Sequence, residues 1–379
     1  MEATTANEQE LTNDTRSGEG ADTRNSDVIT TRKILKDLAP EAYRHPLDQQ
    51  ATTALRAVPG FEFAVSKLSR FGIEQMLYVH FCANSVRVTP KQCSRIHALL
   101  REACAILNVT EPALFLSQSP VVNAFAMGRE KPLMVLHTGL VELLTEEELL
   151  GVIGHELGHI HCGHSVYRLM LLLLMLAGRA GGARLGMGDV FTMPIQAALL
   201  EWARKAEFTA DRAAVLVTQN PEAIFSTLFK ITGGSPKIFE QMDREEFLKQ
   251  AEEFDPEKMS RLDKMYLLMV EGGMEHPIPV FRAQEVLRYG ESDEFKAIMA
   301  GRYIRLDKNG RLSSAFKTDP VSCPQCGKEA DTSFSFCIHC GSDLTALRNE
   351  KAALADGSAE TTAPESDSGE RAPEGSGDA

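Results

Sequence analysis

Residues 154–164 read GHELGHIHCGH, with three glycines and four histidines around a single glutamate. His155 and His159 are four residues apart, so on a helix they lie one turn above each other and can reach one metal ion. Glu156 projects about 100° around such a helix from His155. It would lie beside the ion, where it could take a proton from a water molecule at the metal. The stretch therefore predicts a helix that carries part of a metal site.

A helix start precedes this motif. Thr145 and Glu148 have the spacing of a capping box directly before an apolar run, which predicts a helix over residues 146–162. A glycine-rich break is expected at 178–188, and a second long helix over 195–218.

Short strands are expected before the motif. The runs ALFLS, VVNAFAM and LMVLH within residues 113–137 are separated by Ser-Pro and Gly-Arg-Glu-Lys-Pro, which predicts three strands with turns. Residues 91–107 have apolar residues at helical spacing, and residues 221–300 read as further helices with glycine and proline breaks. The expected fold class is α+β, predominantly helical, with a small β-sheet.

The third metal ligand has to come from another part of the chain. A continuation HExxHxxGxxH would need a glycine at 162 and a histidine at 165, but these residues are Cys162 and Ser165. The stretch RKAEFTADRAA instead offers Glu207 as a ligand and, four residues on, Asp211. Asp211 could accept a hydrogen bond from the remote nitrogen of a ligand histidine. Acidic residues at this spacing usually mark a solvated helix face, but the apolar residues around them favour a buried site.

Three stretches in this order resemble the HtpX-like and CAAX-prenyl-protease family of gluzincin metallopeptidases: NAFAMG, LMVLHTGLVELLTEEELLGVIGHELGHI and WARKAEFTADRAAV. The resemblance covers roughly residues 45–290. It implies a zincin-like fold, a catalytic zinc bound by His155, His159 and Glu207, and Glu156 as the general base. His161 and His164 are expected to lie off the metal, at the end of the helix.

The resemblance also implies a substrate edge and an electrophile. Its candidate substrate-binding strand comprises Asn123, Ala124, Phe125 and Ala126, with which an extended peptide could pair through backbone hydrogen bonds. An ordinary core strand is the alternative. His276, in MEHPIPVFRAQE, resembles the His-Pro segment of the family and is a candidate for stabilising the oxyanion. It could equally be a packing residue at a helix start.

A second metal site is predicted by CPQCGKEADTSFSFCIHCG, residues 323–341. Its two CxxC knuckles place the thiolates of Cys323, Cys326, Cys337 and Cys340 around one zinc ion. Four protein ligands leave no open position, so this zinc would be structural and would supply the folding energy of a small zinc ribbon. The ribbon could dock a protein partner or pack on the peptidase domain.

The net charge of −13 is concentrated at the ends of the chain. Residues 1–30 carry seven acidic and two basic residues and too few apolar residues to offset the entropy of ordering, and the segment 343–379 is similar. Both are expected to be disordered acidic tails. They would flank a metallopeptidase domain over 31–310 and the ribbon over 321–342. The charge is the opposite of that needed for a nucleic-acid partner, which is not expected.

The location is expected to be cytoplasmic, with at most peripheral membrane contact. The N-terminus has no positive start followed by an apolar stretch, so a signal peptide is not expected. The most apolar run, LMLLLLMLA over 169–177, is nine residues long, whereas a membrane span takes about 20. Many members of the family carry true membrane spans. Because the apolar runs of this chain are too short for one, we expect it to be a soluble member that does not act on prenylated proteins within a membrane.

The predicted function is that of a zinc-dependent metalloendopeptidase acting on protein or peptide substrates. The alternative is a partner-recruiting protein that uses its ribbon and acidic tails and keeps a latent or restricted protease site. Deleting residues 321–379 would distinguish the two, because only the enzyme hypothesis expects peptidase activity to survive.

Overall fold

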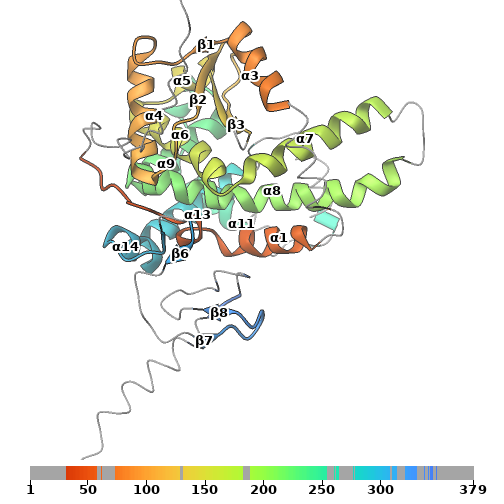
Figure 1. Cartoon of the computed structure of the whole chain (residues 1–379). Helices are drawn as coiled ribbons and strands as arrows, with labels where there is room; N and C mark the ends of the chain where they lie inside the picture. Colours follow the sequence, from red (N-terminus) through yellow and green to blue (C-terminus); the bar gives the residue numbers. More distant parts are fainter. Residues whose placement is uncertain are drawn as a thin grey trace, which may run out of the picture.

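The computed structural model describes residues 31–57, 61, 73–128, 131–181, 188–253, 260, 262–263, 276, 278–307, 310–313, 321–330, 337, 340, 342–344 and 347. The expected tail 1–30, and nearly all of the expected tail 343–379, lie outside these residues. Helices dominate the described part (Figure 1), which confirms the predominantly helical α+β class. They are α1 (Pro46–Arg56), α3 (Ile73–Asn84), α4 (Ser94–Leu107), α5 (Thr138–Leu143), α6 (Glu146–His161), α7 (His164–Gly181), α8 (Gly188–Thr218), α9 (Pro221–Gly233), α10 (Pro236–Phe239), α11 (Arg244–Glu253), α13 (Pro279–Glu291) and α14 (Asp293–Met299).

A four-stranded mixed sheet contains the three predicted strands. Its members are β1 (Val86–Arg87), β2 (Ala113–Ser117), β3 (Ala124–Met127) and β4 (Leu133–His137), in the order β1-β2-β4-β3. β2 runs parallel to β4, whereas β1 and β3 run antiparallel to their neighbours. Among the described residues β3 is therefore an edge strand, paired on one side only.

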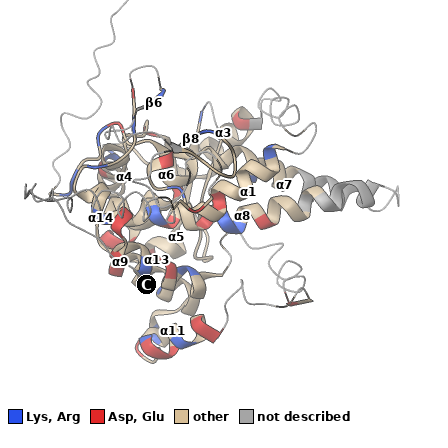
Figure 2. Ribbon diagram, turned by 90° about the horizontal axis from the view of Figure 1, so that it is seen from below, with Lys and Arg blue, Asp and Glu red and all other residues tan. Residues whose placement is uncertain are grey.

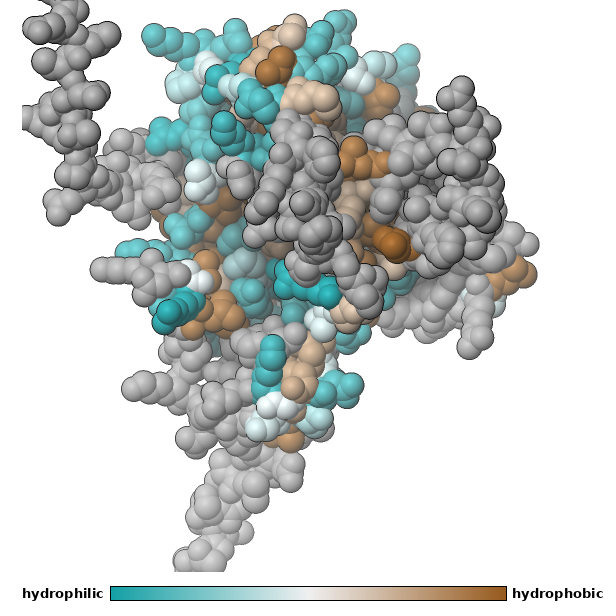
Figure 3. Space-filling model, turned by 45° about the vertical axis from the view of Figure 1, so that its right-hand side comes forward, coloured by the Kyte–Doolittle hydropathy of each residue, from teal (hydrophilic) through white to brown (hydrophobic). Residues whose placement is uncertain are grey.

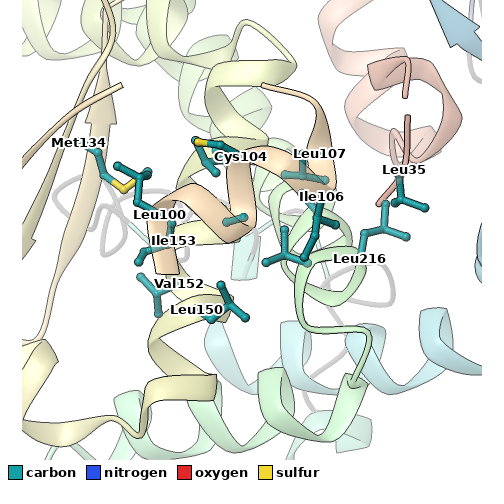
Figure 4. Close-up of a cluster of buried hydrophobic side chains, with 14 of the residues drawn as sticks. Leu35, Leu100, Cys104, Ile106, Leu107, Met134, Leu150, Val152, Ile153 and Leu216 are labelled. Atoms are coloured by element: carbon teal, nitrogen blue, oxygen red, sulfur yellow. The ribbon is translucent and has the colours of Figure 1, made fainter. Parts of the chain in front are cut away.

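The core lies between the sheet and helices α4, α6 and α8. Leu100 of α4, Ile153 of α6 and Met134 of β4 gather in this cluster, and Leu216 of α8 belongs to the same buried set (Figure 4). Leu35, from the segment before α1, is also fully buried here. Buried apolar surface stabilises a fold by about 25 cal/mol per Å². This cluster is therefore the main source of stability for the helices that carry the motif.

Two glycines of the motif allow α6 to approach α8 closely. A Cβ atom at Gly154 would meet the Val217 side chain at 2.8 Å, and one at Gly158 would meet the Ala213 Cβ at 2.6 Å. Side chains at these positions would force the helices apart. The small residues of both helices thus set the distance between the two histidines of α6 and the acidic residues of α8.

The motif helix begins and ends as predicted. The Thr145 side chain accepts a hydrogen bond from the backbone N–H of Glu148, and the Glu148 side chain accepts one from the backbone of Thr145, which is a complete capping box. The helix ends at His161 with Cys162 as its C-cap. Residue 163 turns the chain into α7.

Helices α7 and α8 form a long antiparallel hairpin that extends from the body of the molecule (Figure 1). The sequence predicted a break at 178–188 and a helix start at 195. Instead α7 includes Gly181 and α8 already begins at Gly188. A glycine inside a helix costs about 1 kcal/mol relative to alanine, and the packing of the helix can override so small a cost. None of the described helices combines the length and apolarity needed to cross a bilayer.

Helix α3 covers the outer face of the sheet. Tyr78 and Phe81 pack against Phe115 of β2, while Met76 and Val79 are exposed. Hydrophobic residues are visible at the surface among polar ones in Figure 3. Acidic and basic residues are interspersed over the described helices, and α11 carries several acidic residues (Figure 2).

Two small hairpins follow the helical domain. β5 (Arg305–Leu306) pairs with β6 (Leu312–Ser313), and Arg305 also bridges to Leu38, so this hairpin is tied to the segment before α1. β7 (Val321–Ser322) pairs with β8 (Glu329–Ala330) in the cysteine module.

Candidate metal centre

Three predicted ligands converge between α6 and α8. His155 Nε2 lies 3.2 Å from His159 Nε2. One Glu207 carboxylate oxygen is 3.3 Å from His155 Nε2, and the other is 3.3 Å from His159 Nε2. Tetrahedral zinc with bonds of 2.0–2.1 Å holds its ligand atoms about 3.3 Å apart. The geometry therefore fits zinc.

Asp211 and Arg282 contact these ligand residues. Asp211 Oδ1 is 2.9 Å from His155 Nδ1, as predicted for a partner of a ligand histidine. Arg282 donates two hydrogen bonds of 2.7 Å to the Asp211 carboxylate, and its Nη1 lies 3.0 Å from Glu207. An ionised Asp211 accepts only, so His155 Nδ1 carries a proton and leaves Nε2 free for a metal.

The charge of Arg282 keeps both acidic residues ionised although they are buried. Burial raises the pKa of Asp211, but the charge of Arg282 and its hydrogen bonds lower it to below its ordinary value. Burial likewise raises the pKa of Glu207, and the charges of His276 and Arg282 bring it well below its ordinary value. Sequence reasoning missed Arg282, whose only signal was its place in HPIPVFR.

Glu156 is fully buried next to these residues, and within the described part of the chain neither of its carboxylate oxygens has a hydrogen-bond partner. His276 Nε2 lies 3.5 Å from one of these oxygens, and Arg168 Nη1 lies 3.8 Å from the other. Buried carboxylates are almost always hydrogen-bonded. Glu156 is an exception to this rule among the described residues, and it lies beside the candidate metal site.

His276 belongs to the same cluster. Its Nδ1 lies 2.8 Å from Glu207, and its Nε2 lies 2.8 Å from the carbonyl oxygen of Ala124. One nitrogen of His276 is also close enough to the three predicted ligand atoms to belong to one metal-binding group with them. The histidine thus connects a predicted metal ligand to the edge strand β3.

A cavity of about 560 Å³ opens beside His155 and Glu156. Asn123 and Ala124, two residues of the proposed substrate edge, line it. Phe125 instead packs toward Phe81 of α3, and the Ala126 side chain is buried. The apolar part of its lining includes Leu140, Val152, Ala214, Ile224, Leu228 and Ile231.

The four cysteines of the C-terminal module also converge. The Sγ atoms of Cys323 and Cys340 are 3.7 Å apart, as are those of Cys326 and Cys337. Tetrahedral zinc with bonds of about 2.3 Å to sulfur separates its ligands by about 3.8 Å. The cluster is compatible with a zinc ribbon. Leu344 is fully buried against Cys323 and Cys337 and extends the core of the module beyond residue 342.

His161 and His164 do not belong to the metal-binding group. His161 Nδ1 lies 2.9 Å from the Tyr43 hydroxyl. His164 is the first residue of α7, and its Nδ1 lies 3.1 Å from His159 Nδ1. His164 is therefore in contact with a predicted ligand, which the sequence did not indicate.

Comparisons with known proteins identify the family of the chain. Residues 90–289 match peptidase family M48, and residues 318–345 match a domain of unknown function, DUF7575. The chain is 39% identical over 269 residues to the plastoglobule-localized metallopeptidase 48, chloroplastic, of Arabidopsis thaliana, covering 70% of this chain and 77% of that protein. No solved structure matches the chain.

Bacterial and archaeal proteins are also similar. A protease HtpX homolog of Streptococcus thermophilus is 27% identical over 247 residues, covering 56% of this chain and 80% of that protein. Protease HtpX homolog 2 of Methanosarcina mazei is 28% identical over 174 residues, covering 40% of this chain and 59% of that relative.

Proposed function

Because the chain belongs to peptidase family M48, the HtpX-like zinc metallopeptidases, we propose that it is a zinc-dependent endopeptidase that cleaves peptide bonds of proteins. The observation that carries this proposal is the convergence of His155, His159 and Glu207 beside the unpartnered carboxylate of Glu156. A purely structural zinc site has no need of a buried base without a hydrogen-bond partner.

The residues of the chain divide the proposed work among them. Zinc held by His155, His159 and Glu207 would supply Lewis acidity for the water molecule and for the substrate carbonyl. Glu156 takes the proton of the attacking water on a carboxylate oxygen and passes it to the nitrogen of the leaving amine. The burial of Glu156 excludes competing water molecules from that carboxylate.

His276 is the proposed electrophile. To stabilise the oxyanion, its Nε2–H has to leave the Ala124 carbonyl, 2.8 Å away, and turn toward the substrate. The same exchange frees that carbonyl of β3 for a backbone hydrogen bond with an extended peptide. Substrate binding and placement of the electrophile are thus coupled through one hydrogen bond.

The apolar wall of the cavity supports a preference for substrates with a large aliphatic or aromatic side chain next to the cleaved bond. Ile231→Phe would narrow this cavity from α9. We expect the preferred side chain to become smaller, with kcat/KM for leucine or phenylalanine at that position falling about 10- to 200-fold relative to alanine. A series of peptides that differ only at that position measures the change.

Ile238→Phe is the matched control, because Ile238 is exposed on α10 and does not line the cavity. It should leave the side-chain preference unchanged. An Ile231→Phe profile equal to that of the unchanged protein would contradict the assignment of the cavity to substrate.

Zinc content tests the two metal sites together. We expect two zinc ions per intact chain, and one in either Glu207→Ala or Cys323→Ser, because each variant removes one ligand of one site. Peptidase activity should disappear in Glu207→Ala. Two zinc ions in Glu207→Ala, measured by elemental analysis, would show that Glu207 is not a ligand.

The remaining roles are those expected from the sequence. Cys323, Cys326, Cys337 and Cys340 hold a structural zinc in a ribbon that could dock a protein partner, and the chain acts in the cytoplasm with at most peripheral membrane contact. One similar protein is named chloroplastic and plastoglobule-localized. The family membership does not favour the alternative of a recruiting protein with a latent site.

A further inference from the structure

We propose that helix α1 completes the metal site: Asp48, acting through His164, holds the ligand His159 in the tautomer that can bind the ion. This inference rests on the proposed zinc site. The proposal is based on a series of hydrogen bonds that runs from α8 through Asp48 and His164 to His159. The donor and acceptor in each bond follow from groups in the series that can only donate.

The series of hydrogen bonds starts at two N–H groups that can only donate. The indole N–H of Trp202 donates to Thr52 Oγ1 at 2.9 Å, and the backbone N–H of His45 donates to Thr209 Oγ1 at 3.0 Å. Each threonine hydroxyl thus uses an oxygen lone pair as acceptor, and its own proton points to Asp48. Thr52 donates to Asp48 Oδ1 at 3.0 Å, and Thr209 donates to Oδ2 at 2.7 Å.

The carboxylate then fixes the orientation of His164. Asp48 Oδ2 lies 3.1 Å from His164 Nε2, and an ionised carboxylate only accepts, so Nε2 carries a proton. Both side chains are buried, with 0% of Asp48 and 0% of His164 exposed. In the neutral imidazole the other nitrogen, Nδ1, is therefore an acceptor.

That acceptor faces the metal ligand. The Nδ1 atoms of His164 and His159 are 3.1 Å apart, so one of them must carry the hydrogen and the other must not. With His164 Nδ1 as acceptor, His159 Nδ1–H donates. The lone pair of His159 Nε2 is then free, 3.3 Å from Glu207 and 3.2 Å from His155. If His164 Nδ1 donated instead, the proton of a neutral His159 would lie on Nε2, the nitrogen that has to bind zinc.

The two ligand histidines are thus held in different ways. His155 contacts the carboxylate of Asp211 directly, whereas His159 reaches the carboxylate of Asp48 only through a second imidazole. Asp48 lies on α1, which packs on α8 and precedes residues 90–289, the part that matches the family. The segment before residue 90 therefore supplies part of the metal site.

Zinc affinity of the full chain tests this proposal. We expect Asp48→Asn and His164→Asn each to weaken zinc binding at the His155–His159–Glu207 site about 10- to 100-fold, the usual cost of losing an outer partner of a metal ligand. The double variant should weaken it no further than His164→Asn alone, because both act through one hydrogen bond. A chelator competition series measures each dissociation constant.

His161→Asn is the matched control. This neighbouring histidine bonds Tyr43 and not the ligands, so its variant should bind zinc as the unchanged protein does. Unchanged zinc affinity in His164→Asn, or equal weakening in His161→Asn, would overturn the proposal.

The tautomers can also be read without a variant. In the zinc-loaded, ¹⁵N-histidine-labelled full chain, we expect a proton on His164 Nε2 and on His159 Nδ1, with a scalar coupling between the two Nδ1 atoms. A proton on His164 Nδ1 would overturn the relay. Neither measurement uses peptide cleavage, so failure of the relay is distinguishable from failure of the proposed peptidase activity.

Discussion

Replacing Glu156 with glutamine is expected to lower kcat for peptide cleavage about 10²- to 10⁴-fold while the zinc content stays at its original value. Glutamine has nearly the same shape, but its amide cannot take a proton from water, so the contribution of the general base is lost. Glu156 is not one of the three predicted ligands, and zinc binding should therefore survive. Cleavage of a casein-type substrate and elemental analysis of the same sample measure the two quantities.

Glu146→Gln is the control for this change. Glu146 lies in the first turn of the same helix, its side chain is 66% exposed, and it pairs with the exposed Arg95. That variant should keep full activity. Full activity in Glu156→Gln would end the proposed mechanism, whereas loss of zinc in Glu156→Gln would show that the carboxylate has a structural role at the metal.

The features that were predictable from sequence have local signals. The capping box at Thr145 and Glu148 fixes the start of α6, and the spacing of His155 and His159 fixes their common face. The turns between short apolar runs mark the strands. These features depend on interactions between residues a few positions apart, so they can be predicted directly from the sequence.

The groups that were missed act over long distances in the chain. Asp48 is 116 residues from His164, and Asp211 is 71 residues from Arg282. A single buried aspartate in the first turn of a helix looks like an ordinary helix-start residue. Only the packing of α1 and α13 on α8 shows that these side chains reach the metal centre.

The same packing explains how so many acidic groups can be buried together. Glu156, Glu207 and Asp211 are within the site, and each is at most 4% exposed. Arg282 is the buried cation that pairs with two of them. Removal of one partner from a buried ion pair leaves an uncompensated charge, which costs far more than the pair itself contributes.

Arg282→Met is therefore expected to lower the free energy of unfolding of the zinc-free protein by about 3–5 kcal/mol. Methionine keeps much of the volume but removes the charge of Arg282 from Asp211 and Glu207. Zinc would restore part of the lost stability, because it brings positive charge to Glu207. Urea unfolding of the zinc-free and zinc-loaded chains measures both effects.

Arg288→Met provides the comparison on the same helix, since the Arg288 side chain is 65% exposed and pairs only with Glu285 one turn away. Exposed pairs of this kind contribute about 0–1 kcal/mol, so that variant should unfold almost like the unchanged protein. Adding Asp211→Asn to Arg282→Met should recover stability, because it removes one of the unpaired charges. An Arg282→Met variant as stable as Arg288→Met would contradict the proposed compensation of the buried Asp211 and Glu207 charges by Arg282.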